Sequence, residues 1–306
     1  KNCGILLFIK SFSMAFSWQT FRTRALTAIV FVVVMLAGLL WNHWSFLVLF
    51  SIIHFGCWWE YLKLTEKIHN TSFHIYTKLG FLLLGYGGMI LFCGNRYQVS
   101  NYLVSTNLFL PLSIAGFALL IIGLFRKQTV NVKAFGVATL GFFYISLSWG
   151  FMLSLWQQGI QWCNISNNVI TRGPYILIAS IWINDTMAYI VGSLIGKTPL
   201  SKISPRKTWE GTIGGILLST IIVAILAPQI LVGQFYKPLA IFSGLIALIA
   251  SVAGTFGDIL ESKLKRMAGV KDSGAIMPGH GGFLDRFDSL LLATPFAWLF
   301  VQLFMR

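Results

Sequence analysis

Long runs of apolar residues alternate with short polar stretches along the chain. About nine runs are long enough to cross the hydrocarbon core of a bilayer as helices. They cover residues 25–41, 45–60, 79–93, 108–125, 134–156, 174–195, 211–232, 239–257 and 289–304. The pattern therefore predicts an all-α, polytopic integral membrane protein with about nine transmembrane helices.

Composition supports this prediction. Of the 306 residues, 56% are hydrophobic and only 10% are charged, whereas soluble domains carry about 25% charged residues. A soluble, disordered or disulfide-framed secreted protein is therefore excluded. We expect translation to start at Met14, so that residues 1–13 are not native.

Basic residues give the expected topology. The chain holds 23 Lys and Arg against nine Asp and Glu, a formal net charge of +14. With a cytoplasmic N-terminus and nine spans, all but four of the 23 fall on the cytoplasmic side, as the positive-inside rule requires. The four exceptions are Arg96, Arg172, Lys237 and Arg306. Because membrane topology explains the charge and no nucleic-acid motif is visible, we expect no nucleic-acid partner.

Acidic residues are distributed very differently. Seven of the nine follow residue 184, namely Asp185, Glu210, Asp258, Glu261, Asp272, Asp285 and Asp288. The positive-inside rule explains basic loops but gives no reason to concentrate carboxylates among them. We interpret this concentration as the sign of a functional site.

Two polar segments carry most of this chemistry, residues 196–215 and 257–289. Both mix Gly with Lys, Arg and hydroxyl residues, which suits phosphate binding through backbone N–H groups and cations. Asp258, Glu261 and Ser262 are spaced for one helical face, and Asp285 and Asp288 repeat the i, i+3 spacing. Carboxylates from two such helix ends favour a hard cation such as Mg²⁺.

The second segment resembles the signature of the phosphatidate cytidylyltransferases, also called CDP-diacylglycerol synthases. Every fixed position of that signature is filled by Ser262, Lys265, Arg266, Lys271, Asp272, His280, Gly281, Gly282, Asp285, Arg286 and Asp288, with hydrophobic residues at Phe283, Leu284 and Phe287. The first segment resembles the family through Ser204, Pro205, Lys207, Thr208, Trp209, Glu210, Gly211, Gly214 and Gly215. The preceding span does so through Asp185, Ala188, Tyr189, Gly192, Gly196 and Lys197.

The resemblance extends from about residue 180 to 290, and the N-terminal half matches only in hydropathy and number of spans. Thr186 and Met187 depart from the family pattern, where a small pair such as Ser-Gly is expected. The resemblance implies three parts: a cytoplasmic segment 1–24, membrane helices in 25–173, and a catalytic membrane region 174–306 with cytoplasmic loops 196–210 and 258–288.

The resemblance also implies a reaction, in which CTP and phosphatidic acid give CDP-diacylglycerol and pyrophosphate. The lipid phosphate is itself the nucleophile and is mostly dianionic at neutral pH, because its second pKa is about 6. No strong protein base is then needed, and cations suffice to bring two anions together. We expect an integral protein of the bacterial inner membrane with its active site on the cytoplasmic side.

Site residues follow from the resemblance. We expect Asp258, Asp285 and Asp288 to bind Mg²⁺, and the resemblance leaves room for a monovalent cation such as K⁺. Catalytic contacts to phosphate are assigned to Lys207, Arg266 and Arg286 as well. Substrate binding is assigned to Asp185, Lys207, Ser262, Arg266, Lys271, Asp272, His280, Gly281 and Gly282. A homodimer remains one open alternative for the oligomeric state.

Other functions stay open at this stage. A transporter or channel would use Asp185, near the middle of its span, as an ion site; a structural partner inside the bundle is another interpretation of that residue. A related enzyme acting on a polyprenyl or ether lipid is a closer alternative. A CDP-alcohol phosphotransferase would need an Asp-Gly pair followed by Ala-Arg, and the chain contains no Asp-Gly.

Overall fold

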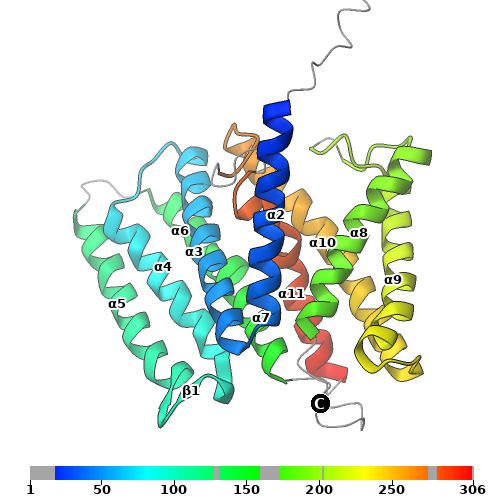
Figure 1. The fold of residues 1–306 in the computed structure, drawn as a ribbon. Coiled ribbons are helices and arrows are strands. Elements are labelled where there is room, and N and C mark those ends of the chain that lie inside the picture. The colour runs from blue at the N-terminus through cyan, green and yellow to red at the C-terminus, as the bar shows by residue number, and fades with distance from the viewer. Residues whose placement is uncertain (1–17, 127–130, 159–172, 202, 275–280, 305–306) are drawn as a thin grey trace, which may run out of the picture.

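A computed structural model describes residues 18–126, 131–158, 173–201, 203–274 and 281–304 (Figure 1). The helices are α2 (Trp18–Leu40), α3 (His43–Ile68), α4 (Ile75–Ile90), α5 (Val104–Arg126), α6 (Val132–Gly141), α7 (Leu147–Gln158), α8 (Gly173–Ile195), α9 (Trp209–Val232), α10 (Lys237–Met267) and α11 (Leu284–Phe304). A 3-10 helix η1 (Leu91–Arg96) continues α4, and a π-helical turn η2 (Phe142–Ser146) joins α6 to α7. Strands β1 (Gln98–Val99) and β2 (Tyr102–Leu103) form an antiparallel hairpin.

The predicted spans are confirmed as helices. Eight helical segments of the described chain are long and apolar enough to cross a membrane, and α2 adds a shorter apolar helix over Leu26–Leu40. Each of the nine apolar runs coincides with one of these segments. The chain is therefore an all-α polytopic membrane protein; the cytoplasmic placement of its N-terminus stays a prediction.

Local sequence explains where key helices begin and end. Asn42 caps α3 by accepting a hydrogen bond from Ser45 N at 2.8 Å, and the Ser45 hydroxyl accepts one from Asn42 N in return. Thr208 caps α9 by accepting from Gly211 N at 3.2 Å. Gly233 ends α9 in the left-handed region, with φ +79°, where a glycine costs least.

The helices form two packed groups (Figure 1). In the N-terminal group, α4 packs along α5 and contacts α3 and α7. In the C-terminal group, α9 packs against α8 and α10, and α10 against α11. Helix α11 also contacts α7 and α3, so it joins the two groups.

Every second connection between helices lies at the same end of the bundle. The start of α2, the turn from α3 to α4, and the connections from α8 to α9 and from α10 to α11 all lie at the top of Figure 1. The β1–β2 hairpin and the turn from α9 to α10 lie at the opposite end. The two polar segments found in the sequence therefore share one end of the molecule.

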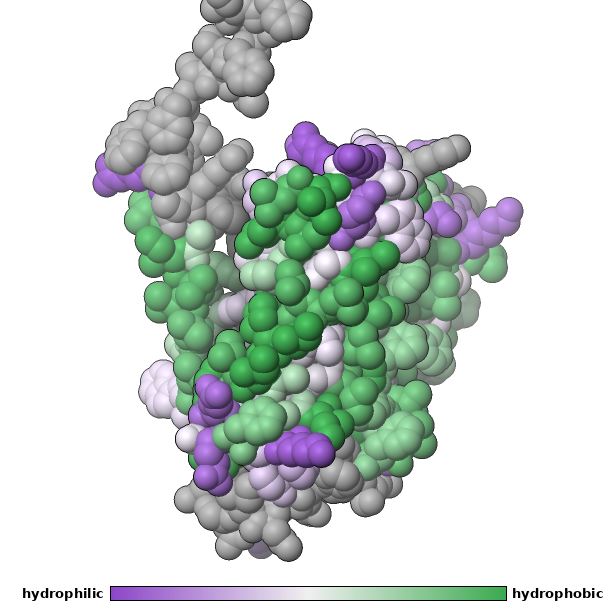
Figure 2. All heavy atoms as spheres, turned by 90° about the vertical axis from the view of Figure 1, so that its right-hand side faces the viewer, coloured by the Kyte–Doolittle hydropathy of each residue, from purple (hydrophilic) through white to green (hydrophobic). Residues whose placement is uncertain are grey.

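The outer surface is apolar between these ends. Figure 2 shows the face that carries α8 and α9, with hydrophobic residues over its middle and hydrophilic residues toward its ends. Residues such as Leu217, Ile221 and Ile230 on α9 are 53–74% exposed. Large exposed aliphatic side chains suit contact with lipid tails.

One helix is longer than its apolar run. Helix α10 has 31 residues and continues to Met267, ten residues beyond the predicted span end at 257. Together with the start of α11 at Leu284, this makes the predicted loop 258–288 helical at both ends. The reason is that helical hydrogen bonding needs no apolar side chains once the helix leaves the bilayer.

Candidate active site

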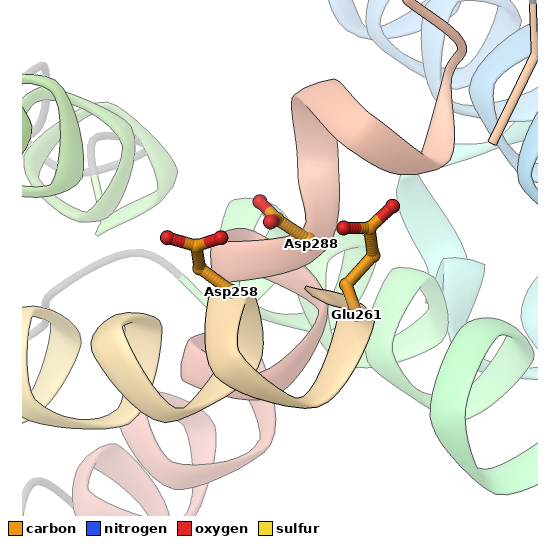
Figure 3. Close-up of side chains that lie close together, drawn as sticks. All are labelled: Asp258, Glu261 and Asp288. Atoms are coloured by element: carbon orange, nitrogen blue, oxygen red, sulfur yellow. The ribbon is translucent and has the colours of Figure 1, made fainter. Parts of the chain in front are cut away.

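Three carboxylates meet where α10 crosses the start of α11. Asp258 and Glu261 extend from α10, and Asp288 extends from α11 toward them (Figure 3). One carboxylate oxygen of each lies within 4.8 Å of those of the other two. Glu261 is 0% exposed and Asp288 8% exposed.

Small residues bring the two helices this close together. A Cβ atom added to Gly257 would lie 2.5 Å from Asp288 O and 3.1 Å from Leu292 Cβ. One added to Gly254 would lie 3.4 Å from Ser289 Cβ. The glycines therefore let the backbones approach until the carboxylates share one site.

Two lysines border the carboxylate cluster of Asp258, Glu261 and Asp288. Lys207 forms an ion pair with Asp258. Lys265 bridges Glu261 at 2.5 Å and Asp285 at 2.6 Å. Ser262, one turn after Asp258, lies 3.4 Å from it and donates a hydrogen bond.

The cluster fits a hard divalent cation. Its donors are all carboxylate oxygens, the ligands that Mg²⁺ prefers. Glu261 Oε1 is buried and has no hydrogen-bond partner among the described residues. Counting Asp285, four carboxylates share two lysines here, so a cation at the cluster would offset the remaining negative charge.

Asp285 is placed differently from the prediction that grouped it with Asp258 and Asp288. Its Oδ1 pairs with Lys265, and its Oδ2 accepts hydrogen bonds from Ser273 N at 2.9 Å and Gly282 N at 2.8 Å. The bond from Gly282 ties the backbone just before α11 to the first turn of that helix. Among the described residues Glu261, not Asp285, is therefore the third member of the cluster.

The segment between α8 and α9 carries Lys207 to the cluster. Leu200 N donates to Lys207 O at 2.7 Å, and Thr198 pairs with Trp209 through a backbone hydrogen bond of 2.9 Å. Glu210, in the first turn of α9, accepts hydrogen bonds from Lys197 N and Thr198 N at 3.2 Å. Through these hydrogen bonds, Glu210 holds the segment after α8 against the start of α9, close to Lys207.

A cavity of about 520 Å³ opens next to the cluster. Its lining includes Asp258, Lys207, Arg206 and a stripe of α8 that contains Asp185 and Tyr189. Asp185 thus lines this cavity together with Lys207 and Asp258, and its functional role stays a prediction. The size is within the range of roughly 300–1,000 Å³ typical of small-molecule sites.

The remaining predicted site residues lie around the turn from α10 to α11. Arg266, Lys271, Asp272 and Arg286 are exposed there. His280 lies outside the described residues, as do residues 1–13 and Met14.

Gly281 and Gly282 leave space for two carboxylate side chains of the protein. Gly281 has φ +81° and lies beside Asp285, and a Cβ atom at Gly282 would contact the Glu60 carboxylate. Both glycines therefore make room for acidic side chains, and their assignment to substrate binding stays a prediction.

Sequence reasoning did not assign three residues that the structure brings to the site: Glu60, Glu261 and Lys265. The i, i+3 spacing grouped Glu261 with Asp258 but did not select it as a ligand. Glu60 is an acid at the end of an apolar run, and the cost of an ionisable residue within a span is a signal for function.

Comparisons with known proteins identify the family of this chain. The family model "Cytidylyltransferase family" matches residues 22–304. A phosphatidate cytidylyltransferase of Bacillus subtilis (strain 168) is 39% identical over 197 residues, which are 63% of this chain and 69% of that protein. The phosphatidate cytidylyltransferase of Staphylococcus epidermidis (strain ATCC 12228 / FDA PCI 1200) is 50% identical over 127 residues, 40% of this chain and 46% of that protein.

A third relative, the phosphatidate cytidylyltransferase of Synechocystis, is 41% identical over 130 residues, 42% of this chain and 43% of that protein. The matched stretch thus spans less than half of the Staphylococcus and Synechocystis relatives. The family model, in contrast, runs from α2 to the end of α11. By that match, this chain belongs to the cytidylyltransferase family.

Proposed function

We propose that this chain transfers the cytidylyl group of CTP to phosphatidic acid, giving CDP-diacylglycerol and pyrophosphate. Family membership and the names of the relatives support this activity. The observation that carries it is the carboxylate cluster of Asp258, Glu261 and Asp288, which adjoins Lys207 and a polar cavity at the end of the bundle.

The reaction needs charge neutralisation more than proton transfer. An oxygen of the lipid phosphate attacks the α-phosphorus of CTP, a new P–O bond forms, and the bond to the bridging oxygen breaks as pyrophosphate leaves. The attacking phosphate already carries negative charge at neutral pH. The protein must therefore hold two anions together and stabilise charge on the leaving group.

Asp258, Glu261 and Asp288 would hold a divalent cation, with Mg²⁺ as our choice. When bound, that ion supplies Lewis-acid stabilisation of the phosphate oxygens. Lys265 keeps Glu261 and Asp285 in place through its two ion pairs. Asp285 thereby takes a positioning role in this proposal.

Basic side chains at the same end would bind the substrate phosphates. Lys207 and Arg206 line the cavity, so they are placed to hold phosphate oxygens beside Asp258. Arg266, Lys271 and Arg286 are exposed on the adjoining turn, where they extend the positive surface for a triphosphate. The planar fork of arginine suits bidentate contact with phosphate.

The cavity is also suited to a lipid headgroup. Its lining on α8 includes Asp185, Tyr189 and Ser193, one helical stripe, and Tyr189 is 77% exposed. Apolar side chains on α8 next to this stripe are exposed, among them Ile190 and Leu194. A lipid phosphate can therefore reach the cavity from the side while its acyl chains stay in the bilayer.

A transfer assay tests the activity directly. Purified protein in detergent is incubated with labelled CTP and phosphatidic acid, with and without Mg²⁺, and lipid-soluble label is measured. We expect transfer only with Mg²⁺ and with CTP or dCTP. Equal transfer from labelled ATP would refute the cytidylyl assignment, and transfer at full rate with excess chelator would refute the divalent cation.

We further propose that the site faces the cytoplasm of a bacterial cell. Ser72, in the turn from α3 to α4, and Asn101, in the β1–β2 hairpin, are exposed at opposite ends of the bundle. After the native cysteines are replaced, S72C should react with an impermeant thiol reagent only from the cytoplasmic side, and N101C only from outside. The reverse pattern would invert the topology.

A further inference from the structure

Glu60 connects the N-terminal group of helices to the start of α11. It lies on α3 and its side chain is 1% exposed. Its carboxylate accepts three hydrogen bonds from residues 213 to 224 positions later in the chain. The motif match does not include this residue, since it lies in the N-terminal half.

Two of the three donors are backbone N–H groups at the beginning of α11. Phe283 N donates to Glu60 Oε1 at 3.0 Å, and Leu284 N donates to Glu60 Oε2 at 2.9 Å. The first N–H groups of a helix have no partner within that helix, and a carboxylate there satisfies them and interacts well with the helix dipole. Glu60 therefore caps α11 from another helix.

The surroundings are shaped around this carboxylate. Cβ atoms added to Gly274 or Gly282 would collide with Glu60 oxygens or with its Cδ atom. Both glycines belong to the described ends of the connection between α10 and α11. A side chain at either position would push the carboxylate away from its donors.

The third hydrogen bond links Glu60 to the carboxylate cluster. Ser273 Oγ lies 2.7 Å from Glu60 Oε2 and 2.9 Å from Asp285 Oδ2. Asp285 pairs with Lys265, and Lys265 pairs with Glu261 of the cluster. A continuous polar chain thus runs from α3 to the site.

We propose that Glu60 is a positioning residue for the cluster. By fixing the first turn of α11, it sets where Asp288, four residues after Leu284, meets Asp258 and Glu261. A displacement of about 1 Å at such a site costs on the order of 100-fold in rate. Only the activity part of this inference rests on the proposed function; the capping contact stands on the geometry alone.

Glu60→Gln tests the proposal with little change in shape. An amide offers one acceptor oxygen, so in either orientation its NH₂ group faces one of the two backbone N–H donors. Glu66→Gln is a matched control, because Glu66 also lies on α3 and accepts a backbone hydrogen bond, from Phe73 N at 2.6 Å, while its ion pair is with Lys78 of α4.

The first measurement is hydrogen exchange of the full-length protein in detergent with a chelator and without substrate. In Glu60→Gln we expect amide protection across residues 281–290 to fall roughly 10-fold or more, because a buried donor loses its acceptor. Glu66→Gln should leave that segment unchanged. Unchanged protection in Glu60→Gln, or an equal loss in both variants, overturns the cap.

The second measurement separates positioning from a merely structural role. Glu60→Gln should lower kcat about 10-fold or more and raise the Mg²⁺ concentration for half-maximal rate, with KM for CTP changed less than about threefold. A loss confined to thermal stability, with kcat and Mg²⁺ dependence as in Glu66→Gln, overturns the positioning role. If the wild-type protein transfers no cytidylyl group, the proposed function fails while the exchange measurement still decides the cap.

Ser273→Ala covers the case in which Glu60→Gln does not fold. It removes only the hydroxyl that lies between Glu60 and Asp285. We expect a smaller rise in the half-saturating Mg²⁺ concentration, about two- to fivefold, because the two backbone donors keep their bonds to Glu60. A Mg²⁺ dependence identical to the wild type would overturn the link between Glu60 and the cluster.

Discussion

The packing around α3 and α7 and the packing of α10 rely on side chains of different size. In the N-terminal group the largest fully buried residues are rings, among them Trp58, Trp149, Phe46 and Phe50. In the C-terminal group, helix α10 instead buries Ala247, Ala250, Ser251, Gly254 and Gly257 along its length. Bulky residues fill space between helices, whereas small residues let their backbones approach.

The two kinds of packing have different roles: the close helix contact forms the carboxylate cluster, and the aromatic packing holds α11 in place. The close contact at Gly257 brings carboxylates of α10 and α11 into one cluster. The aromatic N-terminal group provides a rigid wall for α11, through contacts such as Trp149 with Phe287, whose ring centroids lie 5.7 Å apart. Glu60 is the acid that reaches from the wall to the site.

Asp258→Asn should abolish most of the catalytic activity and leave the packing of the helices unchanged. It keeps the shape and one oxygen but removes a charge from the cluster. We expect turnover to fall roughly 10²–10³-fold, the range for loss of one group that stabilises transition-state charge. The measurement is Mg²⁺-dependent transfer, with a thermal unfolding profile in detergent to show that the variant folds.

Glu66→Gln is the control for this change, since it alters an acid of the N-terminal group outside the site. Its effect on turnover should stay within about twofold. If Asp258→Asn also keeps a near-normal rate at limiting Mg²⁺, the cluster holds no catalytic cation.

Asp285→Asn sharpens the comparison within the site itself. Its carboxylate binds Lys265, Ser273 and Gly282 in the structure, and Lys265 in turn pairs with Glu261 of the cluster. We expect an intermediate loss of about 10-fold, together with an increased Mg²⁺ requirement. A loss as large as that of Asp258→Asn would make Asp285 a direct ligand, as the sequence grouping predicted.

The sequence predicts the membrane fold well because bilayer thickness constrains it strongly. Each apolar run must be long enough to span, so hydropathy alone locates the helices. It does not locate their polar ends: α10 continues through Asp258 and Glu261, where the apolar run has stopped. Hydrogen bonding continues the helix there, and side-chain hydropathy does not report it.

The site is only partly predictable for a related reason. The resemblance pointed to Asp258, Asp288 and Lys207, and the structure brings these three residues together. Sequence alone did not place Glu261 in the cluster rather than Asp285, since that depends on which carboxylate turns back toward the backbone before α11. The contact of Glu60 is harder still to predict from the sequence, because its partner Ser273 is 213 positions away.

Gly211→Ala tests whether close backbone contact is what builds the C-terminal group. A Cβ atom there would lie 2.7 Å from Ala188 O and 2.9 Å from Gly192 Cα, so α8 and α9 must move apart. Both neighbouring atoms are backbone, which cannot rotate away as a flexible side chain can. We expect the free energy of unfolding, measured by titration with a denaturing detergent, to fall by about 1–3 kcal/mol.

Gly136→Ala is the matched substitution in the N-terminal group. Gly136 lies in α6, and a Cβ atom added there would have nothing within 4 Å. Alanine is the better helix former by about 1 kcal/mol, so this variant should equal or exceed the wild type in stability. The two variants add the same methyl group to a helical glycine, and only the neighbouring backbone differs. Equal effects of the two on unfolding would mean that the contact between α8 and α9 is loose, and that small residues do not position the α8 side of the cavity.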